Sequence, residues 1–209
     1  MRNWRARLTP FQQRIYDRSA SISSIHLLPT PQLLEATHSL ETVLAADDQA
    51  QVEALAQIIV NHICWRLGVR TVRVQVQGVR PSNRRGELHG LYTQYGDGSH
   101  NDSIQVWMRT AKLGKVVAFR TFLRTLLHEV CHHLDYTHLQ LRESYHTEGF
   151  FQRESSLFHA LMQQPAEEAP KPAQSLSSMV KEIIAARKRA EQEESSSADS
   201  PIVISRTRS

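Results

Sequence analysis

The sequence predicts an α+β fold in which a small sheet, of three strands or larger and mixed, packs against helices. Residues 71–77 and 103–109 alternate apolar and polar side chains, as half-buried strands do. Residues 116–136 contain no Gly or Pro and repeat apolar residues at the three-and-four spacing of a core-facing helix. The 209 residues, of which 40% are hydrophobic, suffice for one domain with a single core and a tail.

The expected elements are a short N-terminal helix, two longer helices, three strands and two further helices. The helices are expected at residues 10–18, 32–45, 48–67, 116–136 and after residue 146, and the strands at 71–77, 88–95 and 104–108. Asp47 and Asp48 mark the start of the third helix, and Gly68 marks its end. We expect His62 and Trp65 to be packing residues of that helix. Its apolar stripe, expected in the core, comprises Val52, Leu55, Ile59, Ile63 and Leu67.

The composition divides the chain into three parts. Residues 1–30 form a basic arm with a helix, residues 31–165 carry the predicted domain, and residues 166–209 are rich in Pro, Ala, Glu and Ser. We expect this last part to be a largely disordered polar tail, in which residues 179–194 can form an isolated helix.

The formal net charge is +4, and the basic excess lies in two clusters. Such clusters can contact nucleic-acid phosphates, although they more commonly form a solvated surface. Nucleic acid is therefore kept as a secondary candidate partner. The clusters are Arg2, Arg5, Arg7, Arg14 and Arg18 in the arm, and Arg80, Arg84 and Arg85 in a turn.

Membrane and secretion signals are missing from the sequence. Its apolar stretches are shorter than the roughly 18 residues of a membrane span, and its basic N-terminus lacks the apolar run of a secretion signal. The two cysteines, Cys64 and Cys131, are too few for a disulfide framework. Cys131 also points about 100° round the predicted helix from His132, which makes it a poor zinc ligand. We expect a reduced, cytoplasmic protein without a membrane partner.

An H-E-x-x-H pentad, His128 to His132, lies within the predicted helix 116–136. Side chains four residues apart lie one above the other on a helix, so both imidazoles can reach one metal ion. Glu129 lies one residue round from His128, close enough to contact water but poorly placed to be a ligand. The pattern is typical of a zinc peptidase, in which zinc activates a water molecule and a carboxylate takes the proton.

A catalytic zinc usually takes three protein ligands, so a third is expected downstream of the pentad. His138 has the spacing of the metzincin motif, but Asp135 occupies the position of the motif's glycine and no convincing Met-turn follows. His146 is the stronger candidate because of the residues around it. Glu148 and Glu154 are weaker alternatives.

His146 lies four residues before Phe150, and this H-x-x-x-F element follows the H-E-x-x-H helix after a short connection. The two motifs, in this order, resemble those of the SprT-like and related minimal zincin metallopeptidases. The resemblance covers residues 91–161. It implies a zincin-like fold with the sheet packed on the metal helix, and one Zn²⁺ per chain held by His128, His132 and His146. The aromatic ring is expected to pack beneath the third ligand.

The resemblance also implies hydrolysis of peptide bonds in a protein or peptide substrate. Glu129 is the expected catalytic residue, accepting the proton of water and returning it to the leaving amine. Asp135 can accept a hydrogen bond from a ligand imidazole, or can have a structural role at the helix end. A strand at residues 104–108, if it lies at the sheet edge, can bind an extended peptide. Candidate donors to the oxyanion are Tyr136, Tyr145, His133 and Arg153.

Two other functions are compatible with the sequence. A metal-dependent nucleic-acid hydrolase would resemble YbeY-type endoribonucleases, because His128, His132 and His138 match the H-x-x-x-H-x-x-x-x-x-H spacing of that family. That motif does not contain Glu129, which favours the peptidase. The other alternative is a non-catalytic, DNA-associated protein that keeps the zincin fold.

Overall fold

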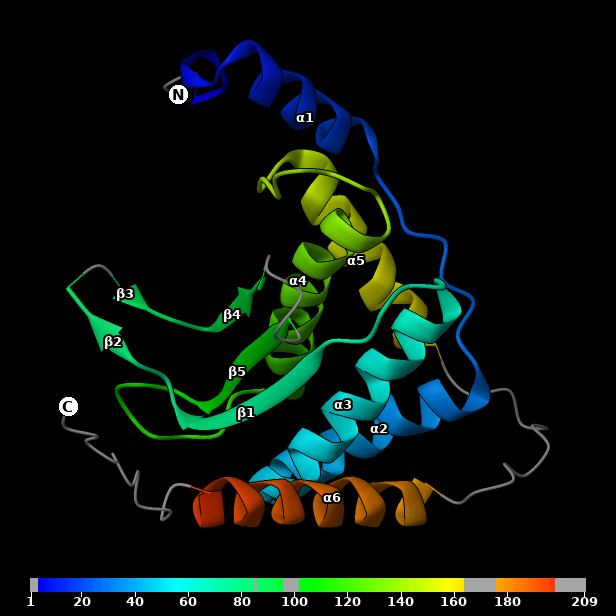
Figure 1. Ribbon diagram of the computed structural model, residues 1–209, viewed down its shortest axis with the longest axis vertical. Coiled ribbons are helices and arrows are strands. Elements are labelled where there is room, and N and C mark those ends of the chain that lie inside the picture. The colour runs from blue at the N-terminus through cyan, green and yellow to red at the C-terminus, as the bar shows by residue number, and fades with distance from the viewer. Residues whose placement is uncertain (1–3, 85, 96–101, 164–175, 198–209) are drawn as a thin grey trace, which may run out of the picture. The chain divides into compact units, whose positions relative to one another are not determined.

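The computed structural model describes residues 4–84, 86–95, 102–163 and 176–197. These residues form an α+β structure with a small mixed sheet, which confirms the α+β class and the small sheet of the prediction (Figure 1). The elements are η1 (Trp4–Arg7), α1 (Pro10–Ser21), α2 (Pro31–Ala45), α3 (Gln49–Arg66), β1 (Arg73–Val79), β2 (Ser82–Asn83), β3 (Gly86–Glu87), β4 (Gly90–Thr93), β5 (Ser103–Arg109), α4 (Phe119–Thr137), α5 (Glu148–Leu161) and α6 (Leu176–Ser197).

The main sheet has the strand order β1-β5-β4, with β5 parallel to β1 and antiparallel to β4. One face is apolar and buried, as the alternating pattern predicts, while Gln75 and Gln105 hydrogen-bond to each other on the opposite face. The short strands β2 and β3 pair within the predicted turn. The buried residues of the apolar face are Val72, Val74, Val76, Ile104, Val106 and Met108.

The outer edge of β1 is covered by polar side chains of α3. The side chain of Gln57 accepts from Val74 N and donates to Val72 O, at 2.7 and 2.9 Å. Glu53 accepts from Val76 N at 2.7 Å, and Gln49 donates to Val76 O at 2.8 Å. These bonds satisfy backbone groups that an edge strand otherwise exposes, so the accessible edge of the sheet is on the β4 side.

Helix α3 matches its predicted range closely, with Asp48 as the N-cap residue that accepts from Gln51 N. Four members of the predicted stripe are buried, and Leu67 is half-buried. The expectation for Trp65 is wrong, because its side chain is 67% exposed and contacts the ring of His62 edge-on from outside the core.

Helix α4 begins three residues later than the predicted start at residue 116. The backbone of residues 115–117 instead pairs with the end of β5. Lys115 O accepts from Thr110 N, and Val117 N donates to Met108 O, both at 2.9 Å. This pairing places α4 against β4 and β5 and beside α5. The fully buried side chains of α4 are Phe122, Leu123, Leu126, Leu127, Val130, Cys131, His133, Leu134 and Asp135.

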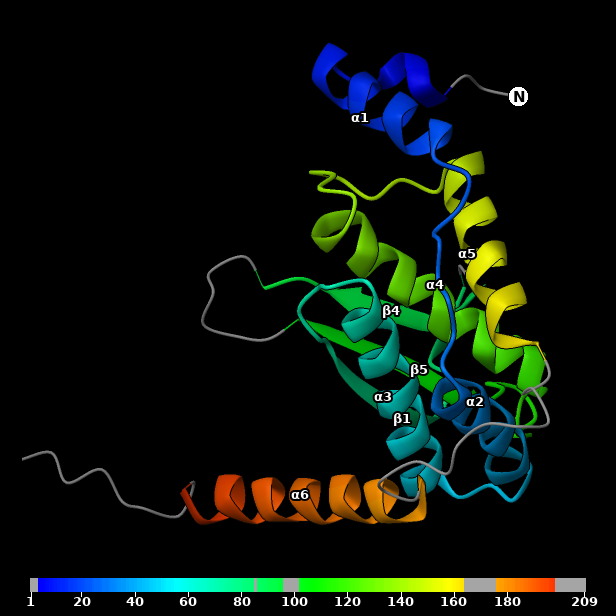
Figure 2. The ribbon, with the colours of Figure 1, turned by 90° about the vertical axis from the view of Figure 1, so that its right-hand side faces the viewer.

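Residues 1–172 form one compact unit, which contains both the basic segment and the predicted domain. Helix α1 packs on α5, and the connection to α2 runs beside α5, where Ile25 N donates to Ser156 Oγ at 3.1 Å (Figure 2). Residues 173–209 form a second unit, which contains α6; the predicted tail thus includes a helix longer than the expected range of 179–194. The remainder of the tail lies outside the described residues.

No helix in the described part of the chain is both long and apolar enough to cross a membrane. Cys64 and Cys131 are both buried and unpaired.

Candidate metal centre

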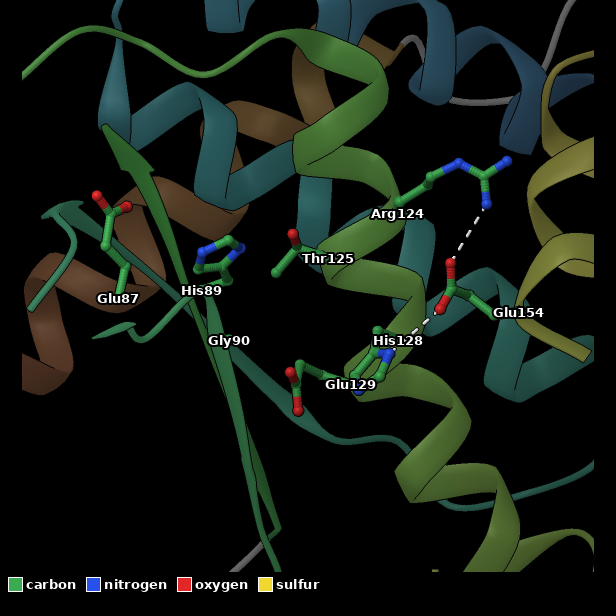
Figure 3. Close-up of a pocket in the computed structure, with 8 residues that line it drawn as sticks. All are labelled: Glu87, His89, Gly90, Arg124, Thr125, His128, Glu129 and Glu154. Carbon is green, nitrogen blue, oxygen red and sulfur yellow. Dashed lines mark hydrogen bonds and ion pairs between the residues drawn. The ribbon is translucent and has the colours of Figure 1, made fainter. Parts of the chain in front are cut away.

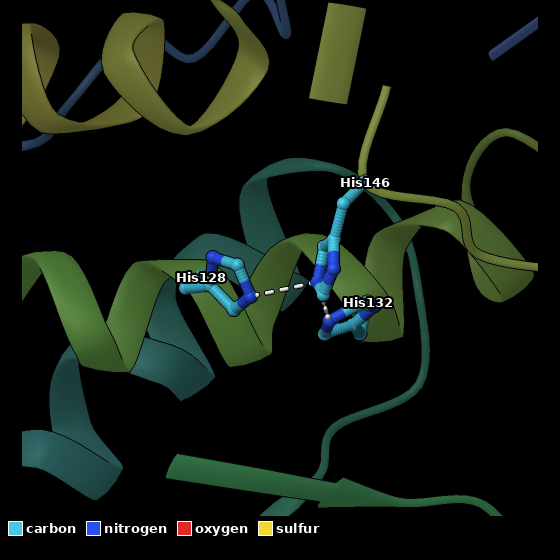
Figure 4. A group of neighbouring side chains, drawn as sticks. All are labelled: His128, His132 and His146. Carbon is cyan, nitrogen blue, oxygen red and sulfur yellow. Dashed lines mark hydrogen bonds between the residues drawn. The ribbon is translucent and has the colours of Figure 1, made fainter. Parts of the chain in front are cut away.

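Three imidazoles converge at one point on the surface of α4. The Nε2 atom of His146 lies 3.0 Å from Nε2 of His128 and 3.0 Å from Nε2 of His132 (Figure 4). His128 and His132 come from successive turns of α4, and His146 comes from the segment that leads into α5. Among the described residues, these three form a group whose ligand atoms all lie within 4.8 Å of one another.

The donor set fits a zinc ion. Zn–N bonds of about 2.0–2.1 Å in a tetrahedral site separate neighbouring nitrogens by about 3.3 Å, close to the observed separations. Burial lowers the pKa of His132 to about 3, with further lowering from His128 and His146. Burial lowers the pKa of His146 as well. Neutral imidazoles are the form that binds metal, so the cluster suits a cation.

The Nδ1 atoms of the two helix histidines have oxygen partners on the side away from the cluster. His128 Nδ1 lies 3.2 Å from Glu154 Oε2 on α5. His132 Nδ1 lies 2.7 Å from Ser144 Oγ, whose hydroxyl donates to Asp135 Oδ2 at 2.7 Å. Because the serine proton goes to the carboxylate, the Nδ1–H of His132 donates to the serine. Each arrangement leaves an Nε2 lone pair for a metal.

Phe150 lies beneath the cluster, as the resemblance implies. Its ring centroid is 4.8 to 5.1 Å from those of all three imidazoles, and the side chain is fully buried at the start of α5. Phe151, which is 49% exposed, also stacks on His146 at 5.8 Å and contacts Phe150 edge-on at 5.6 Å. The third histidine therefore packs against two adjacent aromatic rings.

Glu129 projects from α4 toward β4 rather than into the histidine cluster. The backbone N–H of Tyr92 hydrogen-bonds its carboxylate, and the Tyr92 ring stacks on His132 at 6.5 Å. Burial raises the pKa of Glu129 to about 7, against the opposing effects of His128 and of the Tyr92 N–H. A carboxyl group with this pKa can both accept and release a proton near neutrality.

Gly90 makes room for this carboxylate. A Cβ atom on Gly90 would lie 2.9 Å from Glu129 Cδ and would collide with Oε1. Only glycine lets strand β4 and Glu129 approach so closely.

A pocket of about 460 Å³ adjoins the cluster between β4 and α4 (Figure 3). Glu129 and His128 line one end, and His89 faces them from the segment before β4. Next to His128, Arg124 donates to Glu154 at 3.3 Å (Figure 3). Glu154 thus joins Arg124 to His128, and its position beside Nδ1 makes it a partner of a ligand rather than a ligand.

The other predicted site residues lie apart from the cluster. His138 is exposed and caps the end of α4, and it is not among the three grouped histidines. Glu148 is exposed in the first turn of α5. Asp135 reaches His132 through Ser144 and does not contact the imidazole directly.

Two of the candidate oxyanion donors have other partners. His133 is fully buried and contacts Arg70 O through Nε2, and Arg153 is fully buried against Asp135 and α1. Tyr145 packs against Trp4. Tyr136 is half-buried and stacks on Tyr92 at 6.0 Å. Because Tyr92 also stacks on His132, Tyr136 lies close to the cluster.

The accessible edge strand is β4, whereas residues 104–108 belong to the central strand β5 and cannot accept a further strand. Trp107 N donates to His89 O, which makes Leu91 and Gln105 a hydrogen-bonded pair. The backbone groups of Gly90 and Tyr92 therefore point away from β5, toward the edge beside Glu129.

The sequence contains signals for the roles of Gly90 and Glu154. A glycine within a predicted strand indicates a close approach of another group, here that of Glu129. Glu154 lies eight residues after His146, on the face of α5 turned toward α4. Ser144 had no comparable signal, because only the folded loop brings it to His132.

Comparisons of the chain with protein-family models, with curated proteins and with solved structures find no match in any of the three.

Proposed function

We propose that this chain is a zinc-dependent metallopeptidase with a zincin-like fold. The observation that carries the proposal is that the Nε2 atoms of three histidines converge beside Glu129. Glu129 is a buried carboxylate on α4, the helix that also bears His128 and His132. His128, His132 and His146 hold the ion, and Glu129 is the catalytic residue. When bound, zinc supplies Lewis acidity that activates water and polarises the scissile carbonyl.

Glu129 acts as the general base and then the general acid. Its carboxylate accepts a proton from the attacking water and delivers it to the departing amine nitrogen, so the chain itself is unchanged at the end of the reaction. The Tyr92 N–H and the missing side chain of Gly90 fix where the carboxylate lies.

The substrate binds as an extended peptide along the outer edge of β4. The outward N–H and C=O of Gly90 and the outward C=O of Tyr92 offer hydrogen bonds to a further strand, which runs past Glu129 toward the histidines. The Tyr92 N–H remains bonded to Glu129. The α3 side chains that cover the β1 edge leave β4 as the edge suited to this role. Substrate side chains on one side of such a strand face the pocket between His89 and Arg124.

The nucleic-acid hydrolase alternative depends on His138 as a ligand, and that residue is exposed at the end of α4. The peptidase is favoured because it uses His146 together with Glu129. A non-catalytic zincin-fold protein would have no need for a carboxylate held beside the histidines, and the test below separates the two.

The test combines zinc analysis with cleavage of labelled casein. The wild-type chain is expected to bind one zinc and to cleave casein. Glu129→Gln keeps the side-chain shape and the ligands, so zinc stays bound, while cleavage falls by about 100-fold or more, the scale of a lost general base. Glu41→Gln, an exposed position on α2, is the matched control and should match the wild type.

Full activity of Glu129→Gln would contradict the proposed mechanism. A wild-type chain that binds zinc without cleaving casein or other unstructured proteins would favour the non-catalytic alternative.

A further inference from the structure

The N-terminal arm, defined here as residues 4–22, contacts the loop that carries His146 on both sides of that histidine. Trp4 packs edge-on against Tyr145 at 5.4 Å, and Tyr16 lies 6.0 Å from the same ring. On the other side, Ser19 Oγ lies 3.1 Å from Thr147 Oγ1, within the buried interface. The segment between α4 and α5, residues 138–147, is called the ligand loop below.

Arg153 joins the arm to the core. Its guanidinium is fully buried and donates to Ser19 O and Ile22 O, both at 2.7 Å, where α1 ends. It also donates to Asp135 Oδ1 at 2.9 Å. A buried guanidinium that lost its carbonyl partners would carry a large desolvation cost, so the arm and the ion pair stabilise each other.

The same ion pair leads to a metal ligand. Asp135 uses its second oxygen to accept from Ser144, and Ser144 contacts Nδ1 of His132. A continuous chain of hydrogen bonds therefore runs from the end of α1 to an imidazole of the cluster. Outer partners of this kind set the orientation and tautomer of a ligand.

The helix that follows the ligand loop also fits closely against the arm. A Cβ atom on Gly149 would lie 2.6 Å from Ala20 O and 2.7 Å from Ile22 O. In addition, Arg18 donates to Leu139 O at the start of the loop, at 3.0 Å. The arm thus contacts the loop near its beginning, near its end, and through Arg153.

We propose that the N-terminal arm is a positioning element of the metal centre, which holds the ligand loop and His132 in place so that metal affinity depends on the arm. The inference rests on the proposed zinc site. It assigns a role in metal affinity to residues that are far from the ligands in sequence. Arg153 is the positioning residue that transmits the contact, and it does not touch the substrate.

The test uses the full chain with the double variant Trp4→Ala/Tyr16→Ala, which removes two rings that contact Tyr145 and leaves the core intact. The matched control is Phe11→Ala, an exposed aromatic position on α1, the helix that carries Tyr16. The zinc dissociation constant is measured by competition with a chromophoric chelator. Hydrogen exchange of residues 138–147 is measured in the metal-free protein.

The double variant is expected to bind zinc about tenfold more weakly than the wild type, the lower end of the effect of outer partners. Exchange in the ligand loop should become faster, while the amides of β5 and α4 stay protected. Phe11→Ala should match the wild type in both measurements.

Arg153→Lys provides a second, independent variant. A lysine keeps the charge beside Asp135, but one ammonium cannot span Asp135 and both carbonyls of α1. Zinc binding should again weaken about tenfold. Because Arg153 and the two rings act on one loop, combining all three substitutions should weaken binding by less than the product of the separate effects.

Zinc affinity and loop exchange that are unchanged in the double variant would overturn this inference while leaving the proposed function intact. A wild-type chain that bound no zinc would overturn the proposed function and this inference with it.

Discussion

Two of the three cluster histidines direct Nε2 inward because their Nδ1 atoms have oxygen partners. Glu154 provides that partner for His128, and Ser144 provides it for His132. Glu154 contacts His128 directly and Asp135 acts through Ser144, and each contact orients its imidazole with the proton on Nδ1 and Nε2 directed toward the cluster. The chemistry expected of the site thus depends on residues that do not themselves bind a metal.

The third ligand can be tested by comparing two alanine substitutions. His146→Ala removes a member of the converging group, so zinc affinity should fall by more than the roughly 100-fold that loss of an outer partner causes. His138→Ala removes an exposed side chain at the end of α4 and should leave affinity unchanged. Both are measured by chelator competition, and the opposite ranking would favour the metzincin-like spacing.

Gly90 offers a test of how Glu129 is placed. Alanine at this position would collide with the carboxylate and displace it, so casein cleavage by Gly90→Ala should fall by at least about tenfold, since general-base catalysis depends on reach. Zinc binding should be retained because the ligands lie on the far side of Glu129. Gly68→Ala, at a helix end with open space around it but a φ of 65°, is a control for stability loss without a change at the site.

At the level of elements, local sequence patterns determine some helices and strands, and tertiary contacts determine the boundaries and the strand order. The alternating valines of β1 and the spacing within α4 follow from side-chain periodicity, and both were predicted. The start of α4 was misplaced because residues 115–117 pair with the end of β5, which no local pattern encodes. The strand order β1-β5-β4 likewise depends on pairings between residues about thirty apart, such as Val74 and Ile104.

Strand addition to β4 predicts a period of two along the substrate. Successive backbone amides of an extended peptide point to opposite sides, so only alternate amides face the strand. N-methylation of those amides should reduce cleavage of a peptide substrate about tenfold or more, since each loses a hydrogen bond and adds a clash. Methylation of the intervening amides should have little effect. A scan of N-methylated peptides measures this, and an effect without alternation would exclude pairing with β4.

At the level of the whole molecule, the first compact unit combines segments that are distant in sequence. Arg153 reaches Ser19 and Ile22 across more than 130 residues, and Gly149 fits against the same turn. The sequence predicted the arm as a separate basic segment, because its charges are visible in the composition and its contacts are not. Such contacts exist only in the folded chain, in which α1 packs on α5.

The second unit, residues 173–209, is expected to be dispensable for folding of the first. A chain ending at Pro172 keeps every element from η1 to α5, so its melting temperature should stay within about 2–4 °C of the full chain, which corresponds to about 1 kcal/mol at this size. It should also bind one zinc. A chain ending at Ser156 is the contrasting control, because it removes Leu157, Phe158 and Leu161, which are fully buried, and should not melt cooperatively. Circular dichroism and zinc analysis measure both. If the chain ending at Pro172 lost its cooperative transition or its zinc, the tail would have to contribute to the first unit.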